Sequence, residues 1–385
     1  MANICDYVRW RGDLSFHQSA FNVVDNLILS QIAYVTFEGI APASGDMKVV
    51  TMEEAAKEYF ARTTIQEIES DKSFIAKSPY LLREAGKSKR FKNIRLVDYV
   101  KIVDTDREIQ FSAVTFLLPD GYIFVAFQGT DDTLVGWKEN FNMSFLTPVP
   151  AQTEAVKYLK SAAEENPGRK IRIGGHSKGG NLAVYAALNV DLSIQKRISK
   201  IYDNDGPGFL SSEELENSHD DLKRKIIKIV PQFSVVGMLM QTEADYRIVE
   251  SSETGIMQHD ALSWRVEGPD FVYTDHLSAK SRIWNKAINK WCYEIEPEKR
   301  KQFIDEVFAV VQASGALTLT DINTAVFKSA GASLKMLNGL TPEKRGLVFG
   351  TFAQLYKEYV NVRNDHVITE FSKMYESMKN KSVKD

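Results

Sequence analysis

The run Gly175-His176-Ser177-Lys178-Gly179 places a serine between two glycines, a spacing that suits a nucleophilic hydroxyl. An isoleucine-containing run over 170–173 precedes it, and a segment rich in Leu and Ala follows it. A strand, a sharp turn and a helix in this order form a nucleophile elbow, which exposes the serine oxygen and directs helix N–H groups at nearby negative charge. The glycines are needed because a side chain at either position would clash with the adjoining strand and helix. The sequence therefore predicts Ser177 as a nucleophile.

A serine hydroxyl becomes a good nucleophile when a base accepts its proton, and imidazole is the expected base. In open α/β sheets, sites form beyond the carboxyl ends of the strands, so the base should follow a late strand. His259 follows the last expected strand, over 246–250, and is the predicted base; a surface histidine at a helix start is the alternative. His276 is the next candidate. His176 adjoins the nucleophile, and because the elbow points neighbouring side chains in different directions, it is expected to pack or to hydrogen-bond.

The third member of a triad orients the imidazole and favours its protonated form. Asp205 lies in the run Tyr202-Asp203-Asn204-Asp205-Gly206-Pro207-Gly208, after the strand that follows the elbow helix, and is the predicted acid. The glycines and the proline of this run favour a tight bend that would hold a carboxylate at the strand end. Asp203 is the second choice, and the alternative is that both acids only cap a turn.

A tetrahedral oxyanion needs two hydrogen-bond donors. The backbone N–H of Lys178 is one of them, whatever its side chain does. The second is expected from the loop after an earlier strand, and the run Phe127-Gln128-Gly129-Thr130 ends such a strand. We therefore predict the Thr130 N–H, with its hydroxyl, as the second donor; an ordinary strand-end turn is the alternative.

The elements that must position these residues alternate between strand and helix, which predicts an α/β fold with a mostly parallel sheet and helices on both faces. Short runs with strand character predict strands over 96–103, 109–118, 122–128, 170–173, 197–202, 226–231 and 246–250. Helical spacing predicts helices over 25–34, 52–60, 81–85, 151–165 and 178–188. The chain is thereby divided into a mainly helical segment packed on the core (1–93), the α/β core (94–276) and a C-terminal helical region (277–385). In that last region two apolar helical faces are expected, one with Phe303, Val307, Val310 and Val311, the other with Phe349, Phe352, Tyr356 and Tyr359.

The composition limits the class of protein. The chain has 385 residues, a formal net charge of −3 and a hydrophobic fraction of 44%, so neither nucleic-acid binding nor electrostatic membrane attraction is expected. Two cysteines, Cys5 and Cys292, cannot form a disulfide framework or a metal-ligand pair, and no metal or other cofactor is predicted. Neither a secretory signal nor a membrane-spanning stretch is recognisable, which indicates a cytoplasmic protein.

Two sets of motifs carry a resemblance to known families. Three motifs within 95–265 resemble those of class 3 lipases: Phe127-Gln128-Gly129-Thr130 with Trp137 and Asn140-Phe141, the serine run 175–180, and Gly206-Pro207-Gly208. The opening run 6–13, the serine run and Gln258-His259-Asp260 are similar to an uncharacterised bacterial family of lipase-like α/β-hydrolases of unknown function. This resemblance implies an α/β-hydrolase fold, with Ser177 as nucleophile, His259 as base and Thr130 as oxyanion donor.

The chain departs from class 3 lipases at two places. Those enzymes usually carry an apolar residue after the serine, where this chain has Lys178. They also place their acid after the strand equivalent to 226–231, whereas the segment 232–238 contains no carboxylate. Assigning the acid to Asp205 is physically acceptable because triad roles are set by geometry and not by sequence position.

These residues favour a serine hydrolase that cleaves carboxylic esters, with acyl lipids as a candidate substrate class, through an acyl-enzyme intermediate. The apolar run 235–240 could line an acyl pocket or a lid, although such a run is more often core. The alternative function is a non-catalytic α/β-hydrolase-fold module for binding or scaffolding. Acyl transfer to an acceptor other than water would use the same site. The sequence leaves the natural substrate and the oligomeric state open.

Overall fold

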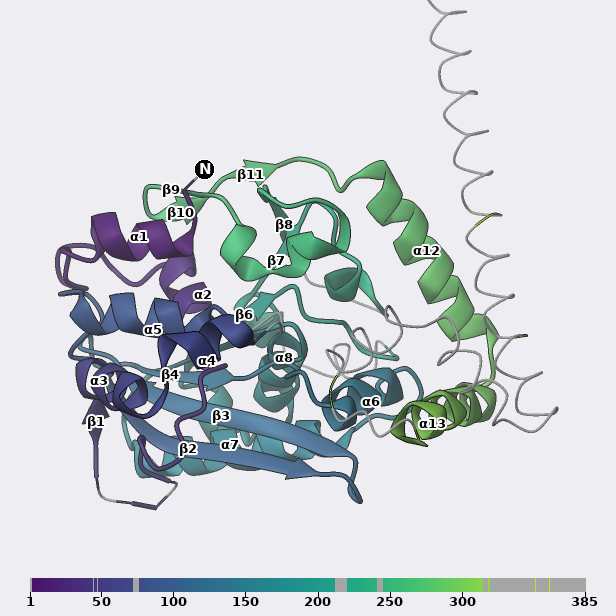
Figure 1. The fold of residues 1–385 in the computed structure, drawn as a ribbon, viewed down its shortest axis with the longest axis horizontal. Helices are drawn as coiled ribbons and strands as arrows, with labels where there is room; N and C mark the ends of the chain where they lie inside the picture. Colours follow the sequence, from purple (N-terminus) through teal and green to yellow (C-terminus); the bar gives the residue numbers. More distant parts are fainter. Residues whose placement is uncertain are drawn as a thin grey trace, which may run out of the picture.

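The computed structural model describes residues 2–43, 45–46, 48–71, 76–211, 220–240 and 245–313, together with residues 318, 350 and 360. Within these residues a nine-stranded sheet has the order β1-β2-β3-β4-β5-β6-β7-β8-β11 (Figure 1). Its strands are β1 (Val50–Thr51), β2 (Arg95–Asp104), β3 (Ile109–Leu117), β4 (Ile123–Phe127), β5 (Ile171–His176), β6 (Ile198–Asn204), β7 (Ile226–Pro231), β8 (Tyr246–Val249) and β11 (Tyr273–Thr274). Neighbours from β4 to β8 run parallel, and the pairs at both edges are antiparallel. A separate hairpin pairs β9 (Val266–Glu267) with β10 (Asp270–Phe271).

Helices lie at both ends of the sheet and over its faces (Figure 1). The N-terminal group is α1 (Ile4–Arg11), α2 (Val23–Ile32), α3 (Met52–Arg62), α4 (Ile65–Ser70) and α5 (Ser78–Lys87). The middle group is α6 (Leu134–Asn142), α7 (Pro150–Glu165), α8 (Lys178–Asn189), α9 (Leu192–Gln195) and α11 (Asp220–Lys223), followed by the short 3-10 helices η1 (Val236–Met238), η2 (Gly255–His259) and η3 (Ala261–Ser263). The C-terminal pair is α12 (Ala279–Glu294) and α13 (Pro297–Ala313), and α13 lies beside α6.

Alternate side chains of β4 serve the two faces of the sheet. Ile123, Val125 and Phe127 join the hydrophobic core under α7 and α8, whereas Phe124 and Ala126 join the core under the N-terminal helices. All five are fully buried. This is the pattern of a strand that is covered on both faces, in which side chains alternate direction with a period of two.

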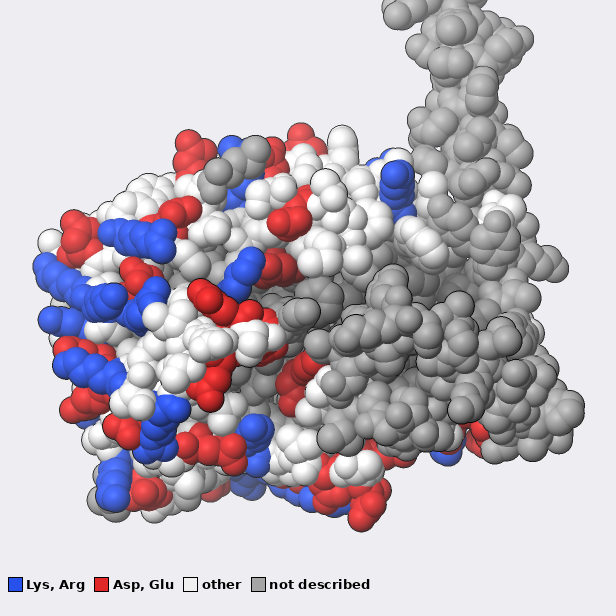
Figure 2. All heavy atoms as spheres, viewed as in Figure 1, with Lys and Arg blue, Asp and Glu red and all other residues white. Residues whose placement is uncertain are grey.

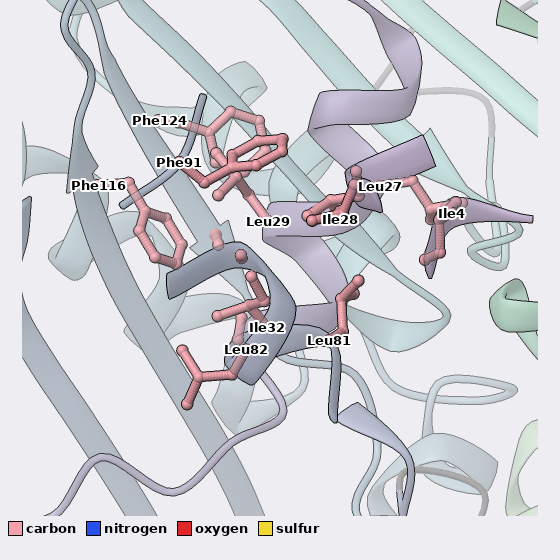
Figure 3. Packing of buried hydrophobic residues seen from close by; sticks show 14 of the residues in the cluster. Ile4, Leu27, Ile28, Leu29, Ile32, Leu81, Leu82, Phe91, Phe116 and Phe124 are labelled. Atoms are coloured by element: carbon pink, nitrogen blue, oxygen red, sulfur yellow. The ribbon is translucent and has the colours of Figure 1, made fainter. Parts of the chain in front are cut away.

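The N-terminal helices share one hydrophobic cluster with the sheet. Figure 3 shows part of this cluster: Ile28 and Leu29 of α2, Leu81 and Leu82 of α5, and Phe116 and Phe124 of β3 and β4. Four of these helices, α1 to α4, begin with a capping box, in which an Asn or Thr side chain and an acidic side chain satisfy the first N–H groups. Local capping thus starts these helices, and burial against the sheet holds them.

A buried ion pair fastens α2 to the segment before β2. The Arg90 guanidinium donates from Nε to Asp25 Oδ1 at 2.7 Å and from Nη2 to Asp25 Oδ2 at 2.5 Å, and both side chains are fully buried. Further donation to the carbonyl oxygens of Leu14, Ser19 and Ala20 uses the remaining guanidinium N–H groups. Such complete satisfaction is what makes a buried charge tolerable.

The surface seen in Figure 2 carries Lys and Arg interspersed with Asp and Glu, over the side that holds the N-terminal helices. Some of these charges form helix pairs, such as Lys57 with Glu53 and Arg62 with Glu58. None of the helices that the structure describes combines the length and the apolar character needed to cross a bilayer.

The expected fold class is confirmed: a large, mostly parallel mixed sheet with helices, of the α/β-hydrolase type. The helices expected over 52–60, 151–165 and 178–188 correspond to α3, α7 and α8, and every expected strand is present within a few residues of its bounds. The expectation that 246–250 is the last strand is wrong, because β9, β10 and β11 follow it. Each of these has two residues, too few for a period to be recognised.

Helix α6 and the C-terminal region match the expectations from the sequence only in part. The sequence pattern gave no indication of α6, although its residues were recognised as a motif. Phe303 is buried in α13 and Val307 packs on the same cluster, as expected, while the side chains of residues 310 and 311 are not described. The aromatic face at 349, 352, 356 and 359 lies outside the described residues. The division at 93 and 276 stays a prediction.

Removing a side chain from the shared N-terminal cluster should destabilise the protein strongly. We expect Leu29→Ala, at a fully buried position, to lower the free energy of unfolding by about 2–5 kcal/mol through lost burial and the cavity left behind. Leu192→Ala, at a leucine that is 56% exposed, is the matched control and should change it by less than about 0.5 kcal/mol. Urea unfolding followed by circular dichroism measures both, and equal small effects would contradict the shared core.

Candidate active site

Ser177 lies at the turn between β5 and α8 in a strained backbone conformation. Its φ of 57° and ψ of −132° are rare for a residue with a side chain, and such outliers often mark functional sites. The Ser177 N–H donates to the Asn204 carbonyl at 2.9 Å, which holds the turn against the end of β6. The serine side chain makes no capping bond to α8, so the helix end does not engage its hydroxyl.

Glycines make this turn possible, as the sequence predicts. A Cβ on Gly175 would lie 2.3 Å from the Gly179 carbonyl carbon, and a Cβ on Gly179 would lie 2.1 Å from the Phe127 carbonyl oxygen. Neither contact can be relieved, because both partners are backbone. The elbow therefore packs directly on the end of β4, which is where the loop with Thr130 begins.

The structure brings His259 and Asp205 together. His259 ends η2, and its Nδ1 lies 2.6 Å from Asp205 Oδ2. Asp205 follows β6 with a φ of 55°, and its carboxylate is fully buried. Because Nδ1 faces a carboxylate, it carries the ring proton, which leaves Nε2 as the free basic atom. The His259 side chain is 22% exposed.

Two further bonds hold the Asp205 carboxylate and its backbone. The Ser234 hydroxyl donates to Asp205 Oδ1 at 2.5 Å, and the Asp205 N–H donates to the Ile229 carbonyl at 2.8 Å. Ser234 is the third residue after β7, in the segment where the sequence lacks a carboxylate. In that segment this chain has the Ser234 hydroxyl, which binds the Asp205 carboxylate that follows β6.

Asp203, the second choice for the acid, is engaged elsewhere. Its Oδ2 accepts from Lys228 Nζ at 2.5 Å, and its Oδ1 accepts from the Gly206 N–H at 2.7 Å. Lys228 also donates to the Gly206 carbonyl at 2.6 Å. This buried pair closes the 203–206 turn and so sets the backbone from which Asp205 projects. Sequence reasoning missed Lys228; a single lysine in the otherwise apolar strand β7 was the available signal.

His176 supports the segment that carries His259. Its Nε2 lies 2.8 Å from the His259 carbonyl oxygen, and the two rings contact each other at a tilt of 33° with centroids 4.6 Å apart. Because a carbonyl can only accept, Nε2 carries the His176 proton. Nδ1 lies 3.1 Å from the hydroxyl of Tyr34, a residue at the end of α2 that sequence reasoning did not single out. His176 therefore packs and hydrogen-bonds, as expected from the sequence.

The loop after β4 lies against the elbow. A Cβ on Gly129 would lie 2.5 Å from the His176 carbonyl oxygen, so only glycine fits there. Thr130 follows, and its hydroxyl oxygen accepts from Asn140 Nδ2 of α6. Among the described residues, neither the Thr130 N–H nor the Lys178 N–H has a hydrogen-bond acceptor.

The remaining sequence candidates lie elsewhere. His276 is exposed in the segment between β11 and α12. In the run 235–240, η1 places Gly237 against the acid: a Cβ there would lie 2.2 Å from Asp205 Oδ1. This run therefore packs behind the acid at that point.

A polar cavity of about 450 Å³ lies between α1, α5 and the segment 252–263. Its lining includes Arg9, Arg83, Glu84 and Asp260. Because an acyl chain needs apolar walls, we do not assign this cavity to one. Within the part of the chain that the structure describes, no group of three or more His, Cys, Asp or Glu side chains could hold a metal ion.

A mostly parallel sheet with a serine at the elbow after β5 defines a protein of the α/β-hydrolase type. The chain belongs to the Mbeg1-like family, whose model matches residues 85–309. This confirms the resemblance to an uncharacterised lipase-like family; the bacterial origin stays a prediction.

Three lipase structures are similar to the chain at low identity. A native lipase–propeptide complex from Rhizomucor miehei is 14% identical with a TM-score of 0.29, over 42% of this chain and 57% of that chain, so less than two thirds of that lipase is spanned. The Lip2 lipase from Yarrowia lipolytica is 13% identical with a TM-score of 0.29, over 46% and 72% of the two chains. The M37 lipase is 16% identical with a TM-score of 0.35, over 55% and 68%. No curated protein matches the chain.

Burial lowers the pKa of His176 from its usual 6.5 to about 3, so the folded protein holds this ring neutral. Between these two pH values the unfolded chain binds a proton that the folded chain does not. Stability should therefore be complete above pH 6.5 and fall as the pH drops toward 3. We expect the free energy of unfolding of His176→Gln to depend less on pH in this range, with a slope smaller than that of wild type by up to about 1.4 kcal/mol per pH unit.

Urea unfolding of both proteins at a series of pH values between 4 and 7.5 measures the difference in slope. His17→Gln, at an exposed histidine, is the matched control and should keep the wild-type slope. Equal slopes for wild type and His176→Gln would contradict the expectation.

Proposed function

We propose that this protein is a serine hydrolase that cleaves carboxylic esters, with acyl lipids as the candidate substrate class. The observation that carries the proposal is the 2.6 Å contact between His259 Nδ1 and the buried Asp205 carboxylate. His176 connects His259 to the elbow serine, because it precedes Ser177 in the chain and donates to the His259 carbonyl oxygen. A nucleophile, an imidazole base and an orienting acid are the parts of a triad.

In the proposed reaction Ser177 Oγ attacks the ester carbonyl while His259 Nε2 takes the hydroxyl proton. The negative charge that develops on the carbonyl oxygen is stabilised by the N–H groups of Lys178 and Thr130. Collapse of the tetrahedral intermediate expels the alcohol, which receives its proton from His259. Water then attacks the acyl-enzyme with His259 again as base, and the acid leaves. Asp205 orients the ring and stabilises its protonated form throughout.

Within the described residues no hydrogen bond joins Ser177 Oγ to His259 Nε2. Catalytic hydrogen bonds of this kind often tighten only in the complex with substrate. The alternative of a non-catalytic binding module rested on the missing carboxylate after β7. The buried Asp205 carboxylate, held by Ser234 and facing His259, weakens that alternative. A cytoplasmic location stays a prediction from the sequence.

Covalent labelling tests the nucleophile. We expect a fluorophosphonate probe to label the purified wild-type protein and to leave Ser177→Ala unlabelled, since phosphonylation needs an activated serine. Ser161→Ala, at a serine of α7 whose hydroxyl pairs with Glu165, is the matched control and should be labelled like wild type. A wild-type protein that stays unlabelled and cleaves no p-nitrophenyl ester would favour the binding module.

Substituting Asp205 and Asp203 one at a time distinguishes the acid that orients His259 from the acid that holds the 203–206 turn. We expect Asp205→Asn to lower turnover by about 10⁴-fold with the fold retained, because the wrong tautomer of His259 is then held. Asp203→Asn should mainly lower the melting temperature, because it leaves the buried Lys228 ammonium without a counter-ion. Turnover on p-nitrophenyl esters of graded acyl length measures both effects and reports the preferred chain length. Loss of turnover in Asp203→Asn alone would move the acid by two positions.

A further inference from the structure

The Lys178 side chain is buried beneath the elbow and is completely satisfied there. Only 1% of it is exposed, and its ammonium donates to three acceptors. These are the Gln110 carbonyl at 2.6 Å, Gln110 Oε1 at 2.6 Å and Glu139 Oε2 at 2.9 Å. A lysine has three N–H donors, so all of them are used. The side chain therefore points away from the reacting atoms and holds a fixed place in the protein.

Gln110 connects the Lys178 side chain to the loop after β4. While its Oε1 accepts from Lys178, its Nε2 donates to the Gly129 carbonyl at 3.4 Å. The Gly129 carbonyl and the Thr130 N–H belong to one planar trans peptide, so they point in opposite directions. A bond that fixes the direction of the carbonyl also fixes the direction of the Thr130 N–H. The charge on Lys178 polarises the amide of Gln110 and strengthens its donation.

Glu139 of α6 closes the network. Its carboxylate is fully buried and balances the Lys178 charge. Oε2 also accepts from the Gln110 N–H at 3.1 Å, and Oε1 accepts from the Ala151 N–H at the start of α7 at 2.8 Å. The next residue, Asn140, donates to the Thr130 hydroxyl. One turn of α6 thus contacts both the elbow lysine and the threonine across from it.

We propose that Lys178 has two functions: its backbone N–H is one oxyanion donor, and its side chain, through Gln110 and Glu139, orients the peptide that supplies the other. Lys178, Gln110 and Glu139 are then positioning residues through their side chains. This inference rests on the proposed function, because it needs an oxyanion at the site. It explains why a charged residue follows the serine: a buried ammonium with three fixed acceptors has one stable geometry, whereas an apolar chain would leave Gln110 free to turn.

The test compares two ways of removing the connection. Lys178→Met with Glu139→Gln replaces the buried pair by neutral groups of similar size, so no uncompensated charge remains. Gln110→Met removes the amide alone. The control is Arg90→Met with Asp25→Asn, which neutralises a fully buried pair that lies away from the elbow, among the N-terminal helices. All three are measured beside wild type for melting temperature, kcat and KM on a short p-nitrophenyl ester, and inhibition by a boronic acid.

A boronic acid forms a tetrahedral adduct with serine and so reports on the oxyanion donors. In both test variants we expect kcat to fall about 10–100-fold, less than the loss of a complete donor, with KM changed by less than about twofold. Boronic acid affinity should fall by the same factor as kcat. The pH at which kcat/KM is half-maximal should be the same as in wild type. The control should lose thermal stability and keep kcat and boronic acid affinity.

Unchanged kcat and boronic acid affinity in folded Gln110→Met would overturn the inference, as would a control that loses kcat as much as the test variants. If the double variant does not fold, Gln110→Met decides alone. A wild-type protein without turnover or fluorophosphonate labelling would instead overturn the proposed function, and this inference with it. The two failures are therefore distinguishable.

Discussion

The contact between the β5–α8 turn and the ends of β4 and β6 is the constraint on which the rest of the site depends. Backbone meets backbone there, since a Cβ on Gly179 would lie 2.1 Å from the Phe127 carbonyl oxygen. On the other side, a Cβ on Gly180 would lie 2.4 Å from Asp203 Oδ1. Three adjacent strands are thereby held with their carboxyl ends at one place. The loops that leave these ends carry Thr130, Ser177 and Asp205, so close packing of glycine decides which side chains can meet.

Buried ion pairs support each side of this turn. Lys178 with Glu139 lies toward β3 and α6, and Lys228 with Asp203 lies toward β7. Burying two charges is expensive, and apolar replacements are often as stable, so such pairs are weak evidence for stability. Their geometry is defined by several hydrogen bonds each, which suits a role in fixing loop positions. Both pairs also bind backbone carbonyls in or next to the loops that they hold.

The sequence predicted most of the strands and helices, and it put forward His259 and Asp205, which lie in contact, with His276 and Asp203 as alternatives. That pairing follows from a topological rule, because both residues come after carboxyl ends of strands in one sheet. The supporting residues could not be predicted in the same way. Gln110 and Lys178 are 68 positions apart, and Tyr34 and His176 are 142 apart, with no spacing that indicates contact. Helix α6 lacked a recognisable pattern for a different reason: its buried Glu139 reads as a surface residue until Lys178 is seen beside it.

The buried pair of Arg90 and Asp25 shows that the N-terminal helices supply a charge partner as well as packing. The segment that the family model matches begins at residue 85, so it contains Arg90 but neither Asp25 nor Tyr34. A fragment cut at that boundary would lose the Asp25 carboxylate that pairs with Arg90 and the Tyr34 phenol that contacts His176. The residues before 85 also complete the hydrophobic cluster on one face of the sheet.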